Sequence, residues 1–248
     1  MQHSSGLIYP DWPAPDWVHA ISTTRQGGVS AGPFSSFNLA QHVGDNAENV
    51  RLNRAHLAGR ICLPQEPAWL TQVHGERVVD IAQVDRSSAI EADASYSLAP
   101  GQVCAVMTAD CLPLLLCHSQ RKIVAVVHAG WRGLAQGVIE ATLSHFADDR
   151  QHVLAWLGPA ISSKAFEVGE DVYQALALDK ESLACFIKMG NDRWHADLFQ
   201  LARLRLYKAG VTAIYGGEVC TYTDFERFFS FRREGETGRM ANLIWMTG

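Results

Sequence analysis

Residues 103–133, VCAVMTADCLPLLLCHSQRKIVAVVHAGWRG, contain three apolar runs that are separated by short polar connections. The runs cover residues 103–108, 113–118 and 122–128. Each run has the length and composition of a buried strand. The connection SQR is short, so we expect the last two strands to pair as an antiparallel hairpin. This stretch predicts a β-sheet core in the middle of the chain.

The same stretch predicts the register of the hairpin. If His118, which precedes the connection SQR, pairs near Ile123, the numbers of paired residues sum to about 241, so that Pro113 faces His128. Cys111 then lies beside Gly130 at the open end of the hairpin. We therefore expect a thiol and an imidazole to meet there.

The rest of the chain predicts helices and strands in alternation, which is typical of a mixed α/β protein. The expected strands lie within residues 67–84 on both sides of His74, within residues 153–162, and within residues 228–246 as a pair. Helices are expected at residues 51–60, from Leu134 to Phe146, from residue 169 or 170, and from the N-cap Asp197 to Gly210.

The composition is that of a globular protein. Of 248 residues, 48% are hydrophobic and 19% are charged, and the net charge is −5, so we expect one domain over residues 1–248 and no nucleic-acid partner. A small molecule is the expected partner. The sequence has neither a signal-peptide pattern nor an apolar run of about 20 residues, which favours a cytoplasmic protein without a membrane partner. The oligomeric state is not readable.

Three residues combine into a candidate metal site. The six cysteines are expected to be thiols, and none belongs to a CxxC pair, so a metal site has to be assembled from separate segments. His74, Cys111 and His128 supply two imidazoles and one thiolate, which are enough for a tetrahedral zinc with one open position. Taken singly, a thiol of this kind is more often a core residue and a turn histidine is more often structural.

Charged residues near these segments are candidates for binding a substrate or moving protons. Arg132 follows His128 closely, and its guanidinium is able to bind a phosphate or carboxylate through two hydrogen bonds; interface packing is the alternative. Arg25 and Arg233 are further phosphate candidates, with solvated surface as the alternative. Asp110 is a candidate proton carrier or second-shell group, and capping a turn is the alternative. The same alternatives hold for weaker candidates, namely Asp93, Arg232 and Arg239.

Six motifs in order along the chain resemble those of the YfiH/YlmD-like family. They are QVHG (72–75), ADA (92–94), TADCLPLLL (108–116), HAGWRG (128–133), LGPAIS (157–162) and FFSFRREGETGR (228–239). Proteins of this family have been called multicopper polyphenol oxidases or laccases, peptidoglycan editing factors and purine nucleoside phosphorylases. The resemblance spans nearly the whole chain.

The resemblance implies a fold, a cofactor and a reaction. The family's metal ligands carry over onto His74, Cys111 and His128, and the implied fold is a single layered α/β domain of mixed sheets flanked by helices. It further implies a bound zinc and phosphorolysis of adenosine, inosine and methylthioadenosine, with adenosine deamination at the same site. Catalytic roles then fall to these three residues and Asp110. Phe231 departs from the family, whose members often carry tyrosine there, so no hydroxyl role is assigned to it.

Three other functions remain open at this stage. A multicopper polyphenol oxidase needs clustered histidines, and none of the ten histidines forms a His-x-His pair, although one copper suits a His-Cys-His site. A cysteine hydrolase acting on peptidoglycan precursors would use Cys111 as nucleophile and His128 as base. A binding protein with a structural zinc would need a fourth protein ligand, and the sequence offers no obvious one.

Overall fold

Three β-sheets carry the fold, which this computed structural model describes for residues 6–146, 149–190 and 192–248. The first sheet contains, in order, β1 (Leu7–Ile8), β2 (Val18–Thr23), β15 (Met240–Met246), β7 (Cys104–Thr108), β3 (Ala68–Thr71) and β5 (Ile90–Glu91). The second contains β14 (Ala213–Gly216), β10 (Val153–Leu157), β8 (Leu112–His118), β9 (Val124–Ala129), β6 (Ala94–Ser97) and β4 (Val78–Asp80). The third contains β11 (Glu167–Val168), β13 (Arg193–Ala196) and β12 (Phe186–Gly190). Parallel and antiparallel pairs occur in both large sheets, so the predicted mixed α/β class is confirmed.

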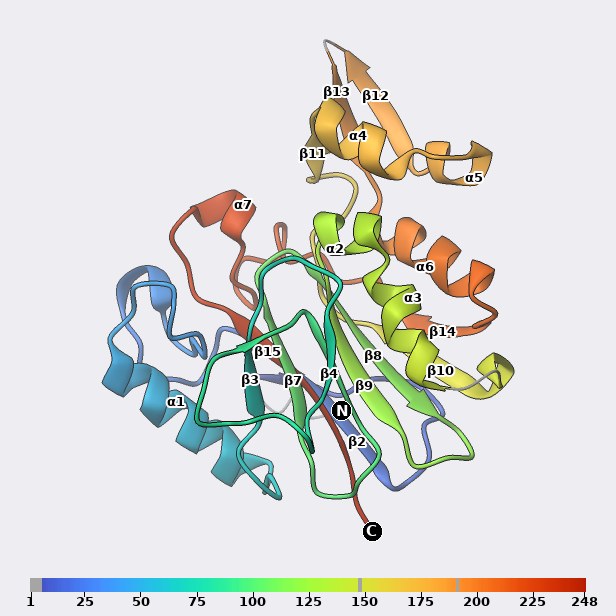
Figure 1. Ribbon diagram of the computed structural model, residues 1–248. Helices are drawn as coiled ribbons and strands as arrows, with labels where there is room; N and C mark the ends of the chain where they lie inside the picture. Colours follow the sequence, from blue (N-terminus) through green and yellow to red (C-terminus); the bar gives the residue numbers. More distant parts are fainter. Residues whose placement is uncertain (1–5, 147–148, 191) are drawn as a thin grey trace.

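Helices cover the outer faces of the two large sheets (Figure 1). They are α1 (Ala47–Arg60), α2 (Trp131–Gln136), α3 (Val138–Leu143) and α6 (Leu198–Lys208). The other helices are α4 (Glu170–Leu176), α5 (Lys180–Leu183) and α7 (Phe231–Glu234), and short 3₁₀ turns lie at Gly32–Phe34, Ser144–Phe146 and Arg150–His152. The third sheet projects from the molecule together with α4 and α5, and we call these five elements the projecting module (Figure 1). No helix in the described ranges is both long and apolar enough to cross a lipid bilayer.

The central strand β8 is buried on both faces, which explains its unbroken apolar sequence. Leu112, Leu114 and Leu116 pack into the core between the second sheet and the helices. Leu115 and Cys117 point the other way, into the core between the two large sheets. A strand with two buried faces loses the usual alternation of polar and apolar residues.

The predicted hairpin and its register are confirmed. β8 and β9 pair antiparallel with Leu112 opposite Ala129 and Pro113 opposite His128, so the numbers of paired residues sum to 241. The helix predicted to begin at Asp197 is confirmed as well, because the Asp197 carboxylate accepts a hydrogen bond from the Gln200 N–H at 3.0 Å. Both predictions depend on neighbouring residues alone, namely a short connection between two strands and one capping aspartate.

Three sequence predictions were wrong in detail. The helix expected from Leu134 begins earlier, at Trp131, and is broken at Gly137, whose positive φ of 96° ends α2 and starts α3 on a new axis. The pair of strands expected near the C-terminus is one strand, β15, preceded by the short helix α7, which Ser230 caps by accepting a hydrogen bond from the Arg233 N–H. The first helix starts at Ala47 rather than residue 51, because Asn46 caps it.

Candidate metal centre

Three segments bring His74, Cys111 and His128 together where the two large sheets meet. His74 lies in the connection from β3 to β4, Cys111 in the connection from β7 to β8, and His128 on β9. One ligand atom from each residue lies within 4.8 Å of the other two, and Cys111 Sγ is 3.9 Å from His74 Nε2. The two connections both cross from the first sheet to the second, which places side chains of distant sequence position at one point.

Asp93 holds two of these residues in place. Its buried carboxylate accepts hydrogen bonds from the backbone N–H groups of Val73, His74 and Gly75 at 3.1, 2.9 and 2.7 Å. It also lies 2.7 Å from Nδ1 of His128. Burial favours the neutral acid, but the hydrogen bonds from His128 and Gly75 outweigh it and lower the pKa of Asp93. An ionised Asp93 accepts the proton of Nδ1 and leaves Nε2 of His128 available as a ligand.

The backbone packs closely around the predicted ligands at His74 and Gly130. His74 adopts a left-handed conformation with φ of 60°, which turns the chain sharply and is unusual for a residue other than glycine. A Cβ atom at Gly130 would lie 3.1 Å from Cδ2 of His74 and 3.2 Å from Sγ of Cys111. Only glycine therefore fits beside the predicted ligands without displacing them.

Asp110 faces away from the three predicted ligands. Its buried carboxylate accepts hydrogen bonds from the hydroxyls of Thr221 and Ser230, at 2.6 and 3.0 Å, and from the backbone N–H of Arg232 at 2.7 Å. Its backbone has a positive φ of 93°, and its carbonyl accepts from the N–H of Ile161. These contacts fix the turn that presents Cys111, so the structure gives Asp110 a positioning role. Its predicted part in proton transfer stays a prediction.

A cavity of about 200 Å³ opens onto the three residues. Its wall is made by His42, Gln72, His74, Met107, Thr108, Ala109, Cys111, His128, Phe231 and Arg239. Gln72 is locked against β7, since its amide donates to the carbonyl of Met107 and accepts from the N–H of the same residue, at 2.8 and 2.7 Å. Phe231 is 58% exposed and forms part of the rim. The wall of the cavity thus combines apolar side chains with imidazole, thiol and guanidinium groups.

The arginines predicted from the sequence lie elsewhere. Arg132 is exposed and stacks on Trp131 with its Cζ 4.3 Å from the ring centroid. Arg25 and Arg233 both form ion pairs with Glu234, at 2.7 and 3.2 Å, and donate further hydrogen bonds to backbone carbonyls. None of the three lines the cavity. The cavity instead contains Arg239, which the sequence marked only as a weaker candidate, and His42, which no sequence signal singled out.

Charge stabilises a thiolate and imidazolium pair in the metal-free site. Burial alone raises the pKa of Cys111, but the charge and hydrogen bonds of His128 and His74 outweigh it and lower that pKa to about 6. Burial also disfavours a charged His128, yet the Cys111 thiolate and Asp93 raise the pKa of His128 to about 9. Cys111 is thus ready to bind a metal at neutral pH, whereas His128 must first lose a proton.

We expect metal affinity to rise with pH for this reason. Between the two pKa values the imidazolium proton of His128 competes with the metal, so binding should release about one proton and affinity should rise about tenfold per pH unit, levelling off once the pH exceeds the pKa of His128. Calorimetric zinc titrations near pH 7.5 and 8.5, roughly, in buffers of different ionisation enthalpy count that proton. A pH-independent affinity with no proton release would contradict the prediction.

The donor set fits a single transition-metal ion. Two imidazole nitrogens and one thiolate are ligands that zinc and copper accept, and tetrahedral zinc would require donor separations of roughly 3.3 to 3.6 Å. The Cys111 Sγ to His74 Nε2 separation of 3.9 Å is slightly longer than that range, and all three ligand atoms lie within 4.8 Å of one another, so the side chains would have to draw closer around an ion. Within the described residues this is the one group of three or more His, Cys, Asp or Glu side chains close enough to hold a metal ion.

Fold and site together define the class: a layered α/β protein with one candidate metal centre at the seam between two mixed sheets. The chain matches, over residues 19–247, the family model described as multi-copper polyphenol oxidoreductase laccase. It belongs to this family, the YfiH family.

Relatives of known sequence or structure align over nearly their whole length. "Purine nucleoside phosphorylase YfiH" of Shigella flexneri is 54% identical over 243 residues, covering 98% of this chain and 99% of the relative. The crystal structure of Neisseria meningitidis protein NMB0706 superposes with a TM-score of 0.94 at 46% identity, covering 98% of this chain and 100% of that chain. YlmD from Geobacillus stearothermophilus superposes with a TM-score of 0.89 at 31% identity, covering 100% and 98%. The resemblance noted from six motifs is therefore confirmed.

Proposed function

We propose that this protein is a zinc-dependent purine nucleoside phosphorylase that cleaves adenosine, inosine and methylthioadenosine and also deaminates adenosine. The observation that carries the proposal is the cluster of His74, Cys111 and His128 at the base of a cavity, in a chain whose relatives are named purine nucleoside phosphorylases. Zinc is preferred because three protein ligands would leave one of its four tetrahedral positions for water or substrate, which is the arrangement of a catalytic zinc site.

Different residues of the site would have different roles in this reaction. His74, Cys111 and His128 would hold the ion, which supplies Lewis-acid chemistry and lowers the pKa of water. The hydrogen bond from Nδ1 of His128 to Asp93 would leave Nε2 free to bind the ion. The apolar wall, with Met107 and the exposed Phe231, suits a flat purine ring.

The test of the proposal is the dependence of inosine cleavage on phosphate. Zinc-loaded protein should release hypoxanthine and ribose 1-phosphate in equal amounts, at a rate that rises with phosphate until it saturates. Phosphate is varied at fixed ionic strength, so that screening of charges is not mistaken for a substrate effect. Chromatography of the products gives the readout. Free ribose formed at an undiminished rate without phosphate would instead identify a nucleoside hydrolase.

A cysteine hydrolase is a second candidate because one observation favours it. The low pKa of Cys111 beside a protonated His128 is also what a thiolate nucleophile requires. The oxidase name of the family model receives less support, because a multicopper reaction needs further ligand clusters and the described residues supply one. The phosphate-binding roles predicted for Arg25, Arg132 and Arg233 stay predictions.

A further inference from the structure

Arg239 places a positive charge in the wall of the cavity that contains the predicted metal ligands. It precedes β15 and lines the same cavity as His74, Cys111 and His128. Its Nη1 donates to the carbonyls of Thr237 and Gly238 at 2.8 and 3.0 Å, which orients the guanidinium. Only one of its nitrogens is used in this way, so the other N–H groups of its planar fork are left for a ligand.

The charge of Arg239 is not neutralised by an acidic side chain. Within residues 6–146, 149–190 and 192–248, Arg239 forms no ion pair with a carboxylate. Burial lowers the pKa of Arg239, and only the more distant charges of Cys111 and Asp110 oppose this. Once a divalent ion shares the charge of the Cys111 thiolate, the cavity carries net positive charge. The Phe231 ring, whose centroid is 5.7 Å from Cζ of Arg239, adds a cation–π contact but no counter-charge. An anionic ligand in the cavity would supply that counter-charge.

His42 adds a second polar group at the same cavity. Burial, followed by the charges of Arg239 and Arg54, lowers the pKa of His42, so its imidazole is neutral and keeps one N–H donor at neutral pH. A ligand that receives hydrogen bonds from a guanidinium and an imidazole N–H, next to a metal ion, needs several acceptor oxygens. A tetrahedral oxyanion meets that requirement.

We propose that Arg239 and His42 form the oxyanion subsite of this metal centre and bind the phosphate that attacks the nucleoside. This inference rests on the proposed phosphorolysis. There an oxygen of hydrogen phosphate bonds to ribose C1′ while the bond from C1′ to the purine nitrogen breaks. The nitrogen leaves with the electron pair and takes up the proton that hydrogen phosphate loses. Arg239 thus replaces Arg132, whose exposed guanidinium stacks on Trp131 outside the cavity.

The experiment measures phosphate affinity in matched variants of the zinc-loaded protein. Arg239→Gln should raise the KM for phosphate roughly 10- to 100-fold, the loss expected for a charge-assisted hydrogen bond, while the KM for inosine changes much less. Arg239→Lys should show a smaller rise, because it keeps the charge but not the fork. His42→Ala, at an exposed position, removes the N–H donor and should raise the phosphate KM by several-fold; it covers the case in which Arg239 variants fail to fold.

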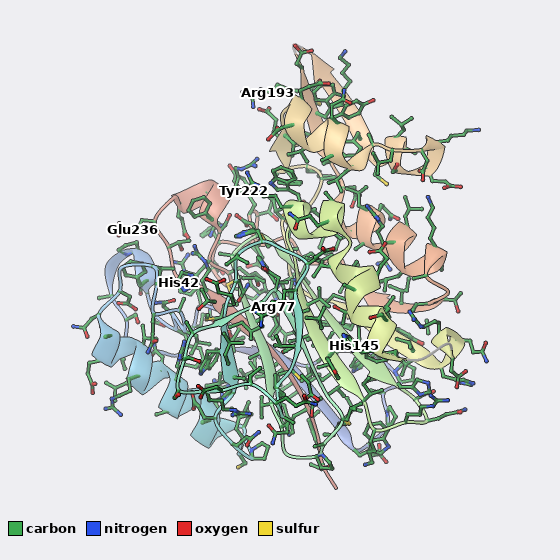
Figure 2. The ribbon with its side chains drawn as sticks, viewed as in Figure 1. His42, Arg77, His145, Arg193, Tyr222 and Glu236 are labelled. Carbon is green, nitrogen blue, oxygen red and sulfur yellow. The ribbon has the colours of Figure 1, made fainter. Side chains whose placement is uncertain are left out.

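The control removes the same charge far from the cavity. Arg193 lies on the projecting module, well separated from His42 in Figure 2, and its side chain is 59% exposed. Arg193→Gln should leave the phosphate KM unchanged. Metal content and thermal unfolding are measured for every variant, since a change in either would explain a loss without any phosphate contact.

Direct binding of inorganic phosphate, measured by calorimetry, separates this inference from the proposed function. If the wild-type protein cleaves inosine by phosphorolysis and Arg239→Gln keeps the wild-type phosphate KM, the subsite is overturned and the function stands. A larger effect of Arg132→Gln than of Arg239→Gln also overturns it. If the wild-type protein binds phosphate, Arg239→Gln does not, and no phosphorolysis occurs, the subsite stands and the function fails.

Discussion

Replacement of Cys111 by serine is expected to remove the metal and, with it, both nucleoside activities. A neutral hydroxyl is a much poorer zinc ligand than a thiolate, so zinc affinity should fall by more than about 100-fold. This loss is larger than the loss typical of replacing a residue that only hydrogen-bonds a metal ligand. The residual phosphorolysis and deamination should follow the residual zinc content. Metal analysis after purification, combined with product analysis on inosine and adenosine, measures both quantities.

The matched control is Cys62→Ser, because Cys62 is an exposed free thiol away from the site. It should keep full zinc and full turnover. A Cys111→Ser protein that retains full zinc but has lost turnover would contradict the ligand assignment and identify Cys111 as a nucleophile. The same experiment therefore decides between the phosphorylase and the cysteine hydrolase.

Asp93→Asn is expected to have the second-largest effect. The substitution keeps the shape of the side chain, but it removes the charge and turns one acceptor oxygen into a donor amide. The Asp93 carboxylate receives three backbone N–H groups from the His74 segment and the Nδ1 proton of His128. Metal affinity should fall about 10- to 100-fold, and each buried N–H left unpaired should cost about 1–3 kcal/mol of stability.

Two measurements check this prediction. Zinc titration against a competing chelator gives the affinity, and thermal unfolding of the metal-free protein gives the stability. Asp85→Asn is the control, since Asp85 is exposed and, among the residues that the structure describes, its carboxylate accepts hydrogen bonds only within its own turn, from Ser87 and Ser88. Wild-type zinc affinity in Asp93→Asn would show that the carboxylate does not orient His128.

The sequence predicts best where the deciding chemistry is local. The register of the β8–β9 hairpin followed from the length of its connection, and the start of α6 followed from one capping aspartate. The motif resemblance and the hairpin together placed His128 near Cys111, although these residues belong to separate segments. A buried strand pair with a short connection leaves few alternative registers, which is why this part was predictable.

Local sequence patterns do not show which residues long-range geometry brings to the cavity. Adjacency to His128 made Arg132 the leading phosphate candidate; in the structure Arg132 lies in α2, is exposed and stacks on Trp131. Arg239, more than a hundred residues further along, reaches the cavity because β15 pairs with β7. Likewise, the two strands expected around His74 exist, but they belong to different sheets, which no local pattern reveals.

The two connections that cross between the large sheets have a consequence for how the molecule unfolds. Each carries one predicted metal ligand, and the third ligand sits on β9, so an ion bound there would act as a cross-link between these three chain segments. The ion binds the native arrangement and not the unfolded chain, so it would stabilise the native state. Separation of the two sheets and release of the ion would then be a single cooperative event, with hydrogen exchange in both connections slowing together as the metal concentration rises.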